Sequence, residues 1–348
     1  MSQPKIFATG ATGYIGGDAL HAIFAAHPDS DVTCLVRNSS KGAQVASKHP
    51  SVKLVYGDLS SSDLVRAEAQ KADIVLNFAD ADHADGASAI SEGLAAREAS
   101  TPAFLIHTSG TGVLTFADIE RKTFGETSTK IYNDWDGVHE VTSLPDFAPH
   151  RNVDKIVLAA ASDKVKTAIV CPPLIYGEGR GAGNTRSIQL PEISRATLER
   201  RRGFMVGEGK SYWTNIHVAD LSQVYLRLLE EAIQGGGKAT WGAEGYYFTE
   251  HGDVIWGDIS RAVAAAAHKE GLIESDDVAS ISGDEAMKLT DGGAVLWGSN
   301  SRGRALRAQK LLGWEAKEKS LMDEVPNAVH LEAQRLGLIK GHAAQVSS

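Results

Sequence analysis

The start of the chain, Lys5–Gly17, combines a short apolar run, a turn rich in glycine and the beginning of a helical pattern. Gly10, Gly13 and Gly16 follow one another at intervals of three. Such a turn lets the chain reverse tightly after a strand, brings backbone N–H groups close to a phosphate and lets the helix pack on the strand. The helix N-terminus then faces the anion with partial positive charge. We therefore predict a dinucleotide pyrophosphate here, rather than an ordinary glycine-rich loop.

Beyond this turn, strand-like and helical patterns alternate through the first half of the chain. The expected strands are short apolar runs: Ile6–Thr9, Val32–Val36, Val52–Tyr56, Ile74–Phe78, Phe104–Thr108 and Thr167–Cys171. Helical patterns separate most of them: Gly16–Ala26, Lys41–Lys48, Ser62–Lys71, Ala87–Ala99 and Asn152–Ala161. Strands that are apolar on both faces favour a parallel sheet covered by helices on both sides. We therefore predict an α/β fold, a doubly wound parallel sheet of the Rossmann type, with a ligand crevice at the carboxyl ends of its strands.

The alternation stops after Cys171, which predicts a second part with a different architecture. We expect two units: a nucleotide-binding domain of residues 1–175 and about 215–245, and a smaller, mostly helical substrate-binding cap of about 176–214 and 246–340. The connection between Thr108 and Asn152 is unusually long for such a fold. Long insertions after a strand are usually functional, so we expect this one to border the substrate or to form a lid.

Composition limits the partners of the chain. Its 348 residues, 43% of them apolar, are enough to bury a large core. A net charge of −9 argues against general nucleic-acid binding, which requires a basic surface. No apolar run reaches the roughly 18 residues of a membrane span and no secretory signal is recognised, so no membrane partner is expected. The two cysteines, Cys34 and Cys171, lie in apolar strands; we expect buried free thiols in a cytoplasmic protein.

The end of the second expected strand indicates which dinucleotide is preferred. NAD-binding chains usually place an acidic residue about 20 residues after the glycine turn, where it accepts from the ribose 2′-hydroxyl. This chain has Arg37 there, followed by Asn38, Ser39, Ser40 and Lys41. A guanidinium can pair with a 2′-phosphate, and the residues after it can add donors. We therefore predict NADP(H) over NAD(H); the alternative is a solvated surface arginine.

Five segments, in order along the chain, carry a resemblance to a known superfamily. They are Thr9–Gly16, Gly57–Leu59, His107–Ser109, Pro172–Gly177 and Ile216–Asp220. In these segments the chain resembles the short-chain dehydrogenase/reductase superfamily, in its extended branch of NAD-dependent epimerases and dehydratases. The resemblance implies a cofactor across the strand ends, in contact with Gly10, Thr12, Gly13, Tyr14, Ile15, Gly16, Arg37, Asp58, Leu59, Phe78, Ala79, Thr108, Lys155 and Pro172. Asp58 could equally cap the helix that follows it.

The resemblance also implies a catalytic serine or threonine, a tyrosine and a lysine. In the family, the tyrosine exchanges a proton while hydride moves, and the lysine four residues later holds the ribose and lowers the phenol pKa. Lys155 matches this lysine, but Arg151 stands at the tyrosine position, and a guanidinium donates no proton near neutral pH. An ungapped alignment puts Gly110 at the hydroxyl position, so Ser109 or Thr111 would have to substitute.

Two functions therefore stay open. In the first, the chain is an NADP(H)-dependent reductase or dehydrogenase of a small apolar carbonyl, imine or activated alkene, with a non-standard proton donor. The candidate catalytic residues are Lys155, Ser109, Thr111, His150 and Tyr176, with Tyr132 and His83 as further proton donors. In the second, it binds NADP(H) without redox chemistry, as a sensor or scaffold. A sugar-nucleotide epimerase or dehydratase is less favoured, although the cap offers cations that could meet a phosphate: Arg180, Arg186, Arg195 and Arg200–Arg202.

Other features favour simpler interpretations. An acidic cluster follows the fourth expected strand: Asp80, Asp82, His83 and Asp85. We interpret these residues as substrate contacts or helix caps, not as metal ligands. Helices 87–99 and 152–161 carry small apolar residues, and family members often dimerise through this pair, which favours a homodimer. Trp135 and Trp213 are the two tryptophans that we expect near a substrate pocket.

Overall fold

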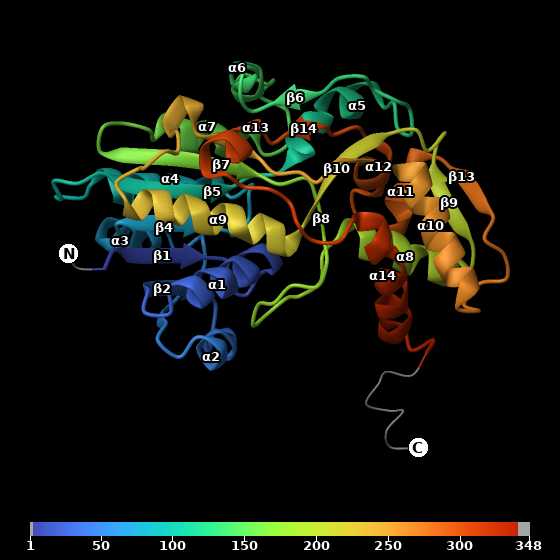
Figure 1. Ribbon diagram of the computed structural model, residues 1–348, viewed down its shortest axis with the longest axis horizontal. Helices are drawn as coiled ribbons and strands as arrows, with labels where there is room; N and C mark the ends of the chain where they lie inside the picture. Colours follow the sequence, from blue (N-terminus) through green and yellow to red (C-terminus); the bar gives the residue numbers. More distant parts are fainter. Residues whose placement is uncertain (1–2, 340–348) are drawn as a thin grey trace.

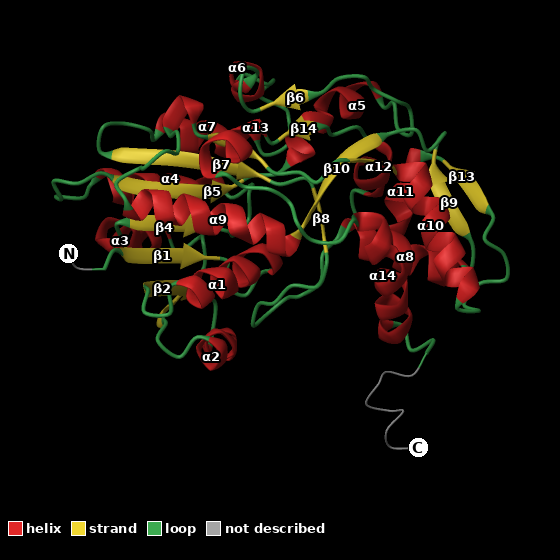
Figure 2. Ribbon diagram, in the orientation of Figure 1, coloured by secondary structure: helices red, strands yellow, loops and turns green. Residues whose placement is uncertain are grey.

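The computed structural model describes residues 3–339, and its main sheet has seven strands (Figures 1 and 2). From one edge to the other they are β11 (Tyr246–Phe248), β7 (Val165–Cys171), β5 (Ala103–Thr108), β4 (Ile74–Asn77), β1 (Lys5–Thr9), β2 (Asp31–Val36) and β3 (Lys53–Tyr56). All neighbouring strands of this sheet are parallel. Because the order runs outward in both directions from β1 and β4, the sheet is doubly wound, as predicted, with its switch point between these two strands.

Helices cover both faces of this sheet. They are α1 (Tyr14–Ala26), α2 (Ser39–Lys48), α3 (Ser62–Lys71), α4 (Ala84–Ala95), α7 (Arg151–Ala159) and α9 (Val218–Ile233). α1 and α9 lie side by side on one face, while α3, α4 and α7 form a row on the other (Figure 1). Every residue of β4 and β5 is buried, as the continuous apolar runs of a parallel sheet require.

The sheet domain includes two segments that we expected in the cap. β11 pairs with β7, and Tyr246, Tyr247 and Phe248 are buried in the core of this domain. α13 (Leu306–Leu312) and Trp314 pack on the same core. The boundary predicted near residue 245 is therefore displaced. A strand of three residues has too little periodicity to be recognised in a sequence, and its position is set by pairing with β7.

A second hydrophobic core defines the cap, which stands beyond the carboxyl ends of the main strands (Figure 2). Its elements are α8 (Gln189–Arg200), β9 (Gly203–Val206), α10 (Trp256–Lys269), β13 (Val278–Ile281), α11 (Gly283–Leu289), α12 (Gly293–Gly298) and α14 (Leu321–Arg335). Trp256, Trp297 and Val329 are buried in this core. A three-stranded sheet links the cap to the main domain: β12 (Asp253–Ile255), β10 (Tyr212–His217) and β8 (Leu174–Tyr176). The cap is mostly helical, as predicted.

The long connection between β5 and α7 is anchored to the rest of the protein. It forms η1 (Thr111–Thr115), α5 (Phe116–Arg121), β6 (Tyr132–Asn133) and α6 (Val138–Thr142), and β6 pairs with β14 (Gly303–Arg304). Asp134 accepts hydrogen bonds from the backbone N–H groups of Phe248 and Arg307, both at 2.9 Å. Burial raises the pKa of Asp134 to about 7. These contacts hold the insertion against the sheet domain, so it forms a fixed wall.

The cysteines agree with the sequence analysis. Cys34 and Cys171 are buried free thiols. Burial raises the pKa of Cys34 to about 12, which keeps it in its unreactive protonated form. Among residues 3–339, no helix is both long enough and apolar enough to cross a membrane.

Candidate cofactor and substrate site

The first of two adjoining cavities opens where β1, β2 and β3 end, and its volume is about 560 Å³. Seven of the predicted cofactor residues line it: Gly10, Thr12, Gly13, Arg37, Asp58, Leu59 and Ala79. Lys41, which follows Arg37 as a predicted additional donor to a 2′-phosphate, and His83 line it as well. The structure therefore brings the glycine turn and the end of β2 to one cavity, as the predicted crevice requires.

The glycine turn has the shape of a phosphate cradle. Gly10 has a left-handed backbone (φ +72°), and a Cβ there would lie 2.7 Å from the backbone nitrogen of Ala79. Gly16 packs against the Gly10 carbonyl and leaves no room for a side chain, so it supports the turn without lining either cavity. Gly13 begins α1, whose first turn has neither a side-chain cap nor an acidic residue. The open N–H groups of this turn fit a pyrophosphate.

Two cations stand at the other end of the first cavity. Arg37 is exposed, and within the part of the chain that the structure describes neither Arg37 nor Lys41 forms an ion pair. Asp58 accepts hydrogen bonds from the N–H groups of Ser60 (3.0 Å) and Ser61 (3.1 Å), just before α3. The N-cap of α3 is Ser61 and has no side-chain cap, so Asp58 orders the preceding turn and does not cap the helix, while it also lines the cavity. The donor set of free cations and open amides suits an anionic dinucleotide.

The second cavity has a volume of about 520 Å³ and shares Gly13 and Asn184 with the first. Its predicted lining residues are Gly13, Tyr14, Ile15, Phe78, Ser109, Thr111, His150 and Pro172. Sequence reasoning missed most of the apolar wall, which the cap and the insertion contribute: Pro149, Ile175, Ile188, Val295 and Leu296. Trp213 lines this cavity, as expected, whereas Trp135 lies outside it beneath Arg307 and Lys310.

The polar groups of the second cavity gather between the ends of β5 and α7. The Oγ of Ser109 and the Oγ1 of Thr111 are buried, and within residues 3–339 neither has a well-aligned hydrogen-bond partner. Gly110 and Gly112 alternate with them and face the imidazole of His150. Both hydroxyl oxygens lie below the surface of the cavity, with Ser109 close to Asp154, so the polar side chain that reaches this corner of the cavity is His150.

His150 precedes α7 and has a left-handed backbone, with φ +64°. Its Nδ1 lies 2.8 Å from Oδ1 of Asp82, in the loop after β4. A carboxylate can only accept, so Nδ1 donates in this contact. The hydrogen bond from His150 holds the pKa of Asp82 below its usual range. The structure thus joins two residues that are 68 positions apart in the sequence.

The structure does not bring three other predicted site residues to the cavities. The Nζ of Lys155 pairs with Asp146 (2.8 Å), and its side chain is half exposed on the outer face of α7. The hydroxyl of Tyr176 donates to the carbonyl of Lys319 (2.8 Å), and Thr108 bonds to the hydroxyl of Tyr225 (2.7 Å). None of the three lines either cavity.

The helical phase of α7 explains the position of Lys155. His150 and Asp154, four residues apart, face inward, while Arg151 donates to the carbonyls of Thr142 (2.6 Å) and Leu144 (3.2 Å). Successive side chains of a helix point about 100° apart. Lys155 follows inward-facing Asp154 by one residue and therefore points away from the site. Burial raises the pKa of Asp154 to about 6. The inward pair is therefore histidine and aspartate, where the family has tyrosine and lysine.

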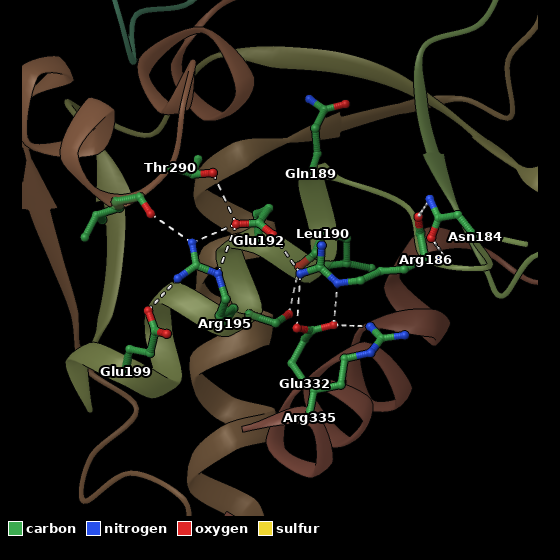
Figure 3. Close-up of polar contacts among 12 residues, drawn as sticks. Asn184, Arg186, Gln189, Leu190, Glu192, Arg195, Glu199, Thr290, Glu332 and Arg335 are labelled. Atoms are coloured by element: carbon green, nitrogen blue, oxygen red, sulfur yellow. Dashed lines mark hydrogen bonds and ion pairs between the residues drawn. The ribbon is translucent and has the colours of Figure 1, made fainter. Parts of the chain in front are cut away.

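The arginines expected to meet a phosphate are already paired (Figure 3). Arg186 is the one arginine or lysine that lines the second cavity, and it contacts Glu332 (2.9 Å) and Glu192 (2.8 Å). Arg195 also turns to Glu192 (2.7 Å), and a further pair joins it to Glu199. The remaining cations follow the same pattern or lie elsewhere: Arg180 pairs with buried Asp18, and Arg200–Arg202 do not line the cavity. The second cavity therefore offers no free cation.

A loop from the cap crosses the glycine turn and joins the cavities. The backbone N–H of Asn184 donates to the carbonyl of Thr12 at 2.9 Å. Gly181 packs on Gly17 so closely that a Cβ on Gly181 would lie 2.7 Å from the Gly17 Cα. Contacts between backbones this close require glycine on both sides. The sequence analysis missed this contact, although the two glycine-rich segments were visible as separate features.

Comparison with known proteins agrees with this geometry. The NAD dependent epimerase/dehydratase family matches residues 6–241. The oxidase ucsJ of Acremonium sp is 40% identical over 344 residues, which is 96% of this chain and 99% of that protein. An uncharacterized protein of Saccharomyces cerevisiae is 25% identical over 332 residues, 92% of this chain and 97% of that one.

Solved structures share the fold at low sequence identity. A UDP-glucose 4-epimerase of Thermotoga maritima, in a structure with UDP-glucose, has a TM-score of 0.63 at 13% identity and covers 95% of this chain and 99% of its own. A dTDP-glucose 4,6-dehydratase of Bacillus anthracis, in complex with NAD, has a TM-score of 0.65 at 14% identity, with coverage of 95% and 97%. The chain belongs to the NAD-dependent epimerase/dehydratase family, in the extended branch of the short-chain dehydrogenases/reductases.

Proposed function

We propose that this protein is an NADP(H)-dependent oxidoreductase of a small, uncharged, largely apolar carbonyl, imine or activated alkene. The observation that carries the proposal is the contrast between the two cavities. The first offers free cations and open amides, and the second offers apolar walls with the imidazole of His150. The resemblance to a relative named as an oxidase supports redox chemistry.

The first cavity would hold the phosphates of the cofactor in two places. The open amides at the start of α1 suit its pyrophosphate, whereas the N–H of Gly13 already donates to the carbonyl of Gly10 (2.8 Å). Arg37 and Lys41 suit a 2′-phosphate, because no acidic residue occupies the end of β2. When it is bound, NADP(H) supplies or accepts the hydride. Phe78 and Pro172, in the second cavity, would face its reactive ring.

The charges of the second cavity favour an uncharged substrate. A sugar nucleotide brings two phosphate charges, which such enzymes meet with cations. Arg186 is held by two carboxylates, and freeing it would leave Glu332 buried without its partner. This arrangement supports an apolar substrate over a nucleotide one. A sensor or scaffold would need no polar corner in this cavity, so the imidazole of His150 at the cavity wall favours an enzyme.

Turnover with a chosen panel tests the proposal. The purified protein is incubated with NADPH or NADH and with apolar ketones, aldehydes, enones and imines, and UDP-glucose is the charged comparison. We expect NADPH oxidation with at least one apolar class and none with UDP-glucose. Calorimetry with oxidised and reduced cofactor is run in parallel. Tight binding without turnover in either direction would support the sensor instead, and no binding of either dinucleotide would overturn both.

A further inference from the structure

We propose that His150 is the catalytic proton donor and acceptor of this site and that Asp82 is the residue that positions it. The inference rests on the proposed function, since it names the group that exchanges a proton with the substrate oxygen or nitrogen. In this proposal, a histidine and a carboxylate from two separate loops take the roles that tyrosine and lysine have in the family. Three structural observations carry it.

The first observation is the orientation of the imidazole. Nδ1 of His150 is fixed by Oδ1 of Asp82 at 2.8 Å, which leaves Nε2 as the free end of the ring. Nε2 lies 3.2 Å from the position of a Cβ on Gly110 and 3.1 Å from one on Gly112. Any side chain at these two positions would crowd the ring. The two glycines therefore leave space in which the imidazole reaches the second cavity.

The second observation is the backbone that carries the ring. The left-handed conformation of His150 costs roughly 1 kcal/mol in a residue with a side chain and persists where the surroundings impose it. Here the buried guanidinium of Arg151 fixes the start of α7 by its bonds to Thr142 and Leu144. The strained residue lies at the wall of the cavity. Strain of this kind is typical of functional sites.

The third observation is the charge around the ring. Asp82 faces His150 from the loop after β4, and Asp154 faces it from one turn further along α7. His107 of β5 is also close, but burial lowers its pKa to about 3, so it adds no positive charge near neutral pH. Two carboxylates thus face the imidazole, and its Nε2 is directed toward the two glycines.

The proton moves through these groups as follows. In the direction of reduction, the Nε2–H bond of His150 breaks and a new O–H bond forms on the substrate, while the carbonyl carbon receives hydride. The neutral imidazole keeps its proton on Nδ1, against Asp82, and regains one at Nε2 from water, because the His150 side chain is itself partly exposed. Oxidation of an alcohol reverses each step, with neutral Nε2 as the base.

Variants of the two residues test the assignment. His150→Asn is the main variant, because asparagine adopts left-handed backbone more readily than most residues and its amide is no acid. We expect kcat to fall about 100-fold while the affinity for NADPH stays within about twofold. Asp82→Asn should lower kcat about tenfold and leave the affinity for NADPH unchanged, since the imidazole loses the carboxylate that fixes Nδ1. Asp163→Asn, an exposed carboxyl after α7 that lines neither cavity, is the control and should change neither.

A measurement on the protein without ligands keeps this test separate from the proposed function. Nitrogen-15 NMR of the histidine rings should show the proton of neutral His150 on Nδ1, and Asp82→Asn should remove this preference. Turnover that survives in His150→Asn, or a ring that carries its proton on Nε2 in the wild-type protein, overturns the proposal. If the NMR result holds but no substrate turns over, the proposed function fails while the pairing of His150 with Asp82 stands.

Discussion

The two cavities share a wall, yet within residues 3–339 the cationic side chains of the first are unpaired and the arginine of the second is paired. The first leaves Arg37 and Lys41 without carboxylate partners. The second holds Arg186 between Glu192 and Glu332 (Figure 3). Releasing a paired cation leaves its partner uncompensated, so only free cations attract an anionic ligand at low cost. The comparison teaches that the pairing of arginines, more than their number, shows where phosphates bind.

The largest expected effect is the loss of cofactor binding in the first cavity. Gly10→Ala should weaken binding of NADPH at least about 100-fold, because the new Cβ would lie 2.7 Å from the Ala79 nitrogen and deform the turn. Gly271→Ala is a matched control, since Gly271 has nearly the same backbone (φ +71°) with nothing within 4 Å of the added Cβ. It should cost about 1 kcal/mol of stability and leave binding intact. Isothermal calorimetry and thermal unfolding check both, and equal losses in the two variants would contradict the cradle.

The next prediction removes a carboxylate that pairs with the arginine of the second cavity. Glu332→Ala should lower the free energy of unfolding by about 2–3 kcal/mol, because its almost fully buried carboxylate pairs with Arg186 and Arg335. Glu199→Ala removes a half-exposed partner of Arg195 and should cost less than about 1 kcal/mol. Urea denaturation measures both. The Glu332 variant should also gain affinity for UDP, and the comparison of the cavities fails if Arg186 binds UDP equally well in the wild type.

The third prediction concerns Asp154, a buried carboxylate behind the second cavity that makes the stability of the protein depend on pH. Burial raises the pKa of Asp154 from its ordinary 3.8 to about 6, so the folded state favours the protonated form. The resulting penalty is absent below the ordinary pKa, grows as the pH rises to about 6 and is then constant. Asp154→Asn avoids it and should be more stable than wild type by about 2 kcal/mol at pH 8, with little difference at pH 4. Chemical denaturation at both pH values tests this; a difference independent of pH would refute it.

The smallest expected effect concerns cofactor choice. Arg37→Ala should weaken binding of NADPH by about tenfold and leave NADH almost unchanged, since only the former has a 2′-phosphate. Arg121→Ala, an exposed arginine of α5 outside both cavities, is the control and should affect neither. Binding of both dinucleotides to each variant gives the answer. Equal loss for the two cofactors in Arg37→Ala would mean that the arginine meets no 2′-phosphate.

Much of the sheet domain could be predicted from the sequence because its signals are local. The glycine turn and the six expected strands are runs of neighbouring residues whose spacing directly reflects backbone geometry. β11 was missed because three residues show no period, and its place depends on pairing with β7, far away in the chain. The walls of the second cavity were missed for the same reason, since Val295 and Leu296 reach it only through the packing of the cap.

The candidate site was harder to predict because its key contacts join distant residues. The sequence correctly predicted a helix at α7, but the spacing of its residues did not determine which side chains face the interior. Lys155, matched to the family's lysine, points to the surface, whereas Arg151 and Asp154 are buried and His150 lines the second cavity. The partner of His150, Asp82, stood in an acidic cluster that we interpreted as substrate contacts or helix caps. Only the fold shows which member of that cluster meets the imidazole.

The hydrogen bond from the backbone N–H of Asn184 to the carbonyl of Thr12 has a consequence for the order in which ligands arrive. Thr12 belongs to the turn that a dinucleotide would steady, and Asn184 also forms part of the neighbouring chamber. Whatever stiffens one of these residues therefore stiffens the other, and thermodynamic linkage makes the effect mutual. A coenzyme bound at the turn would thus complete the compartment for its companion molecule, and that companion, once seated, would delay the coenzyme's departure.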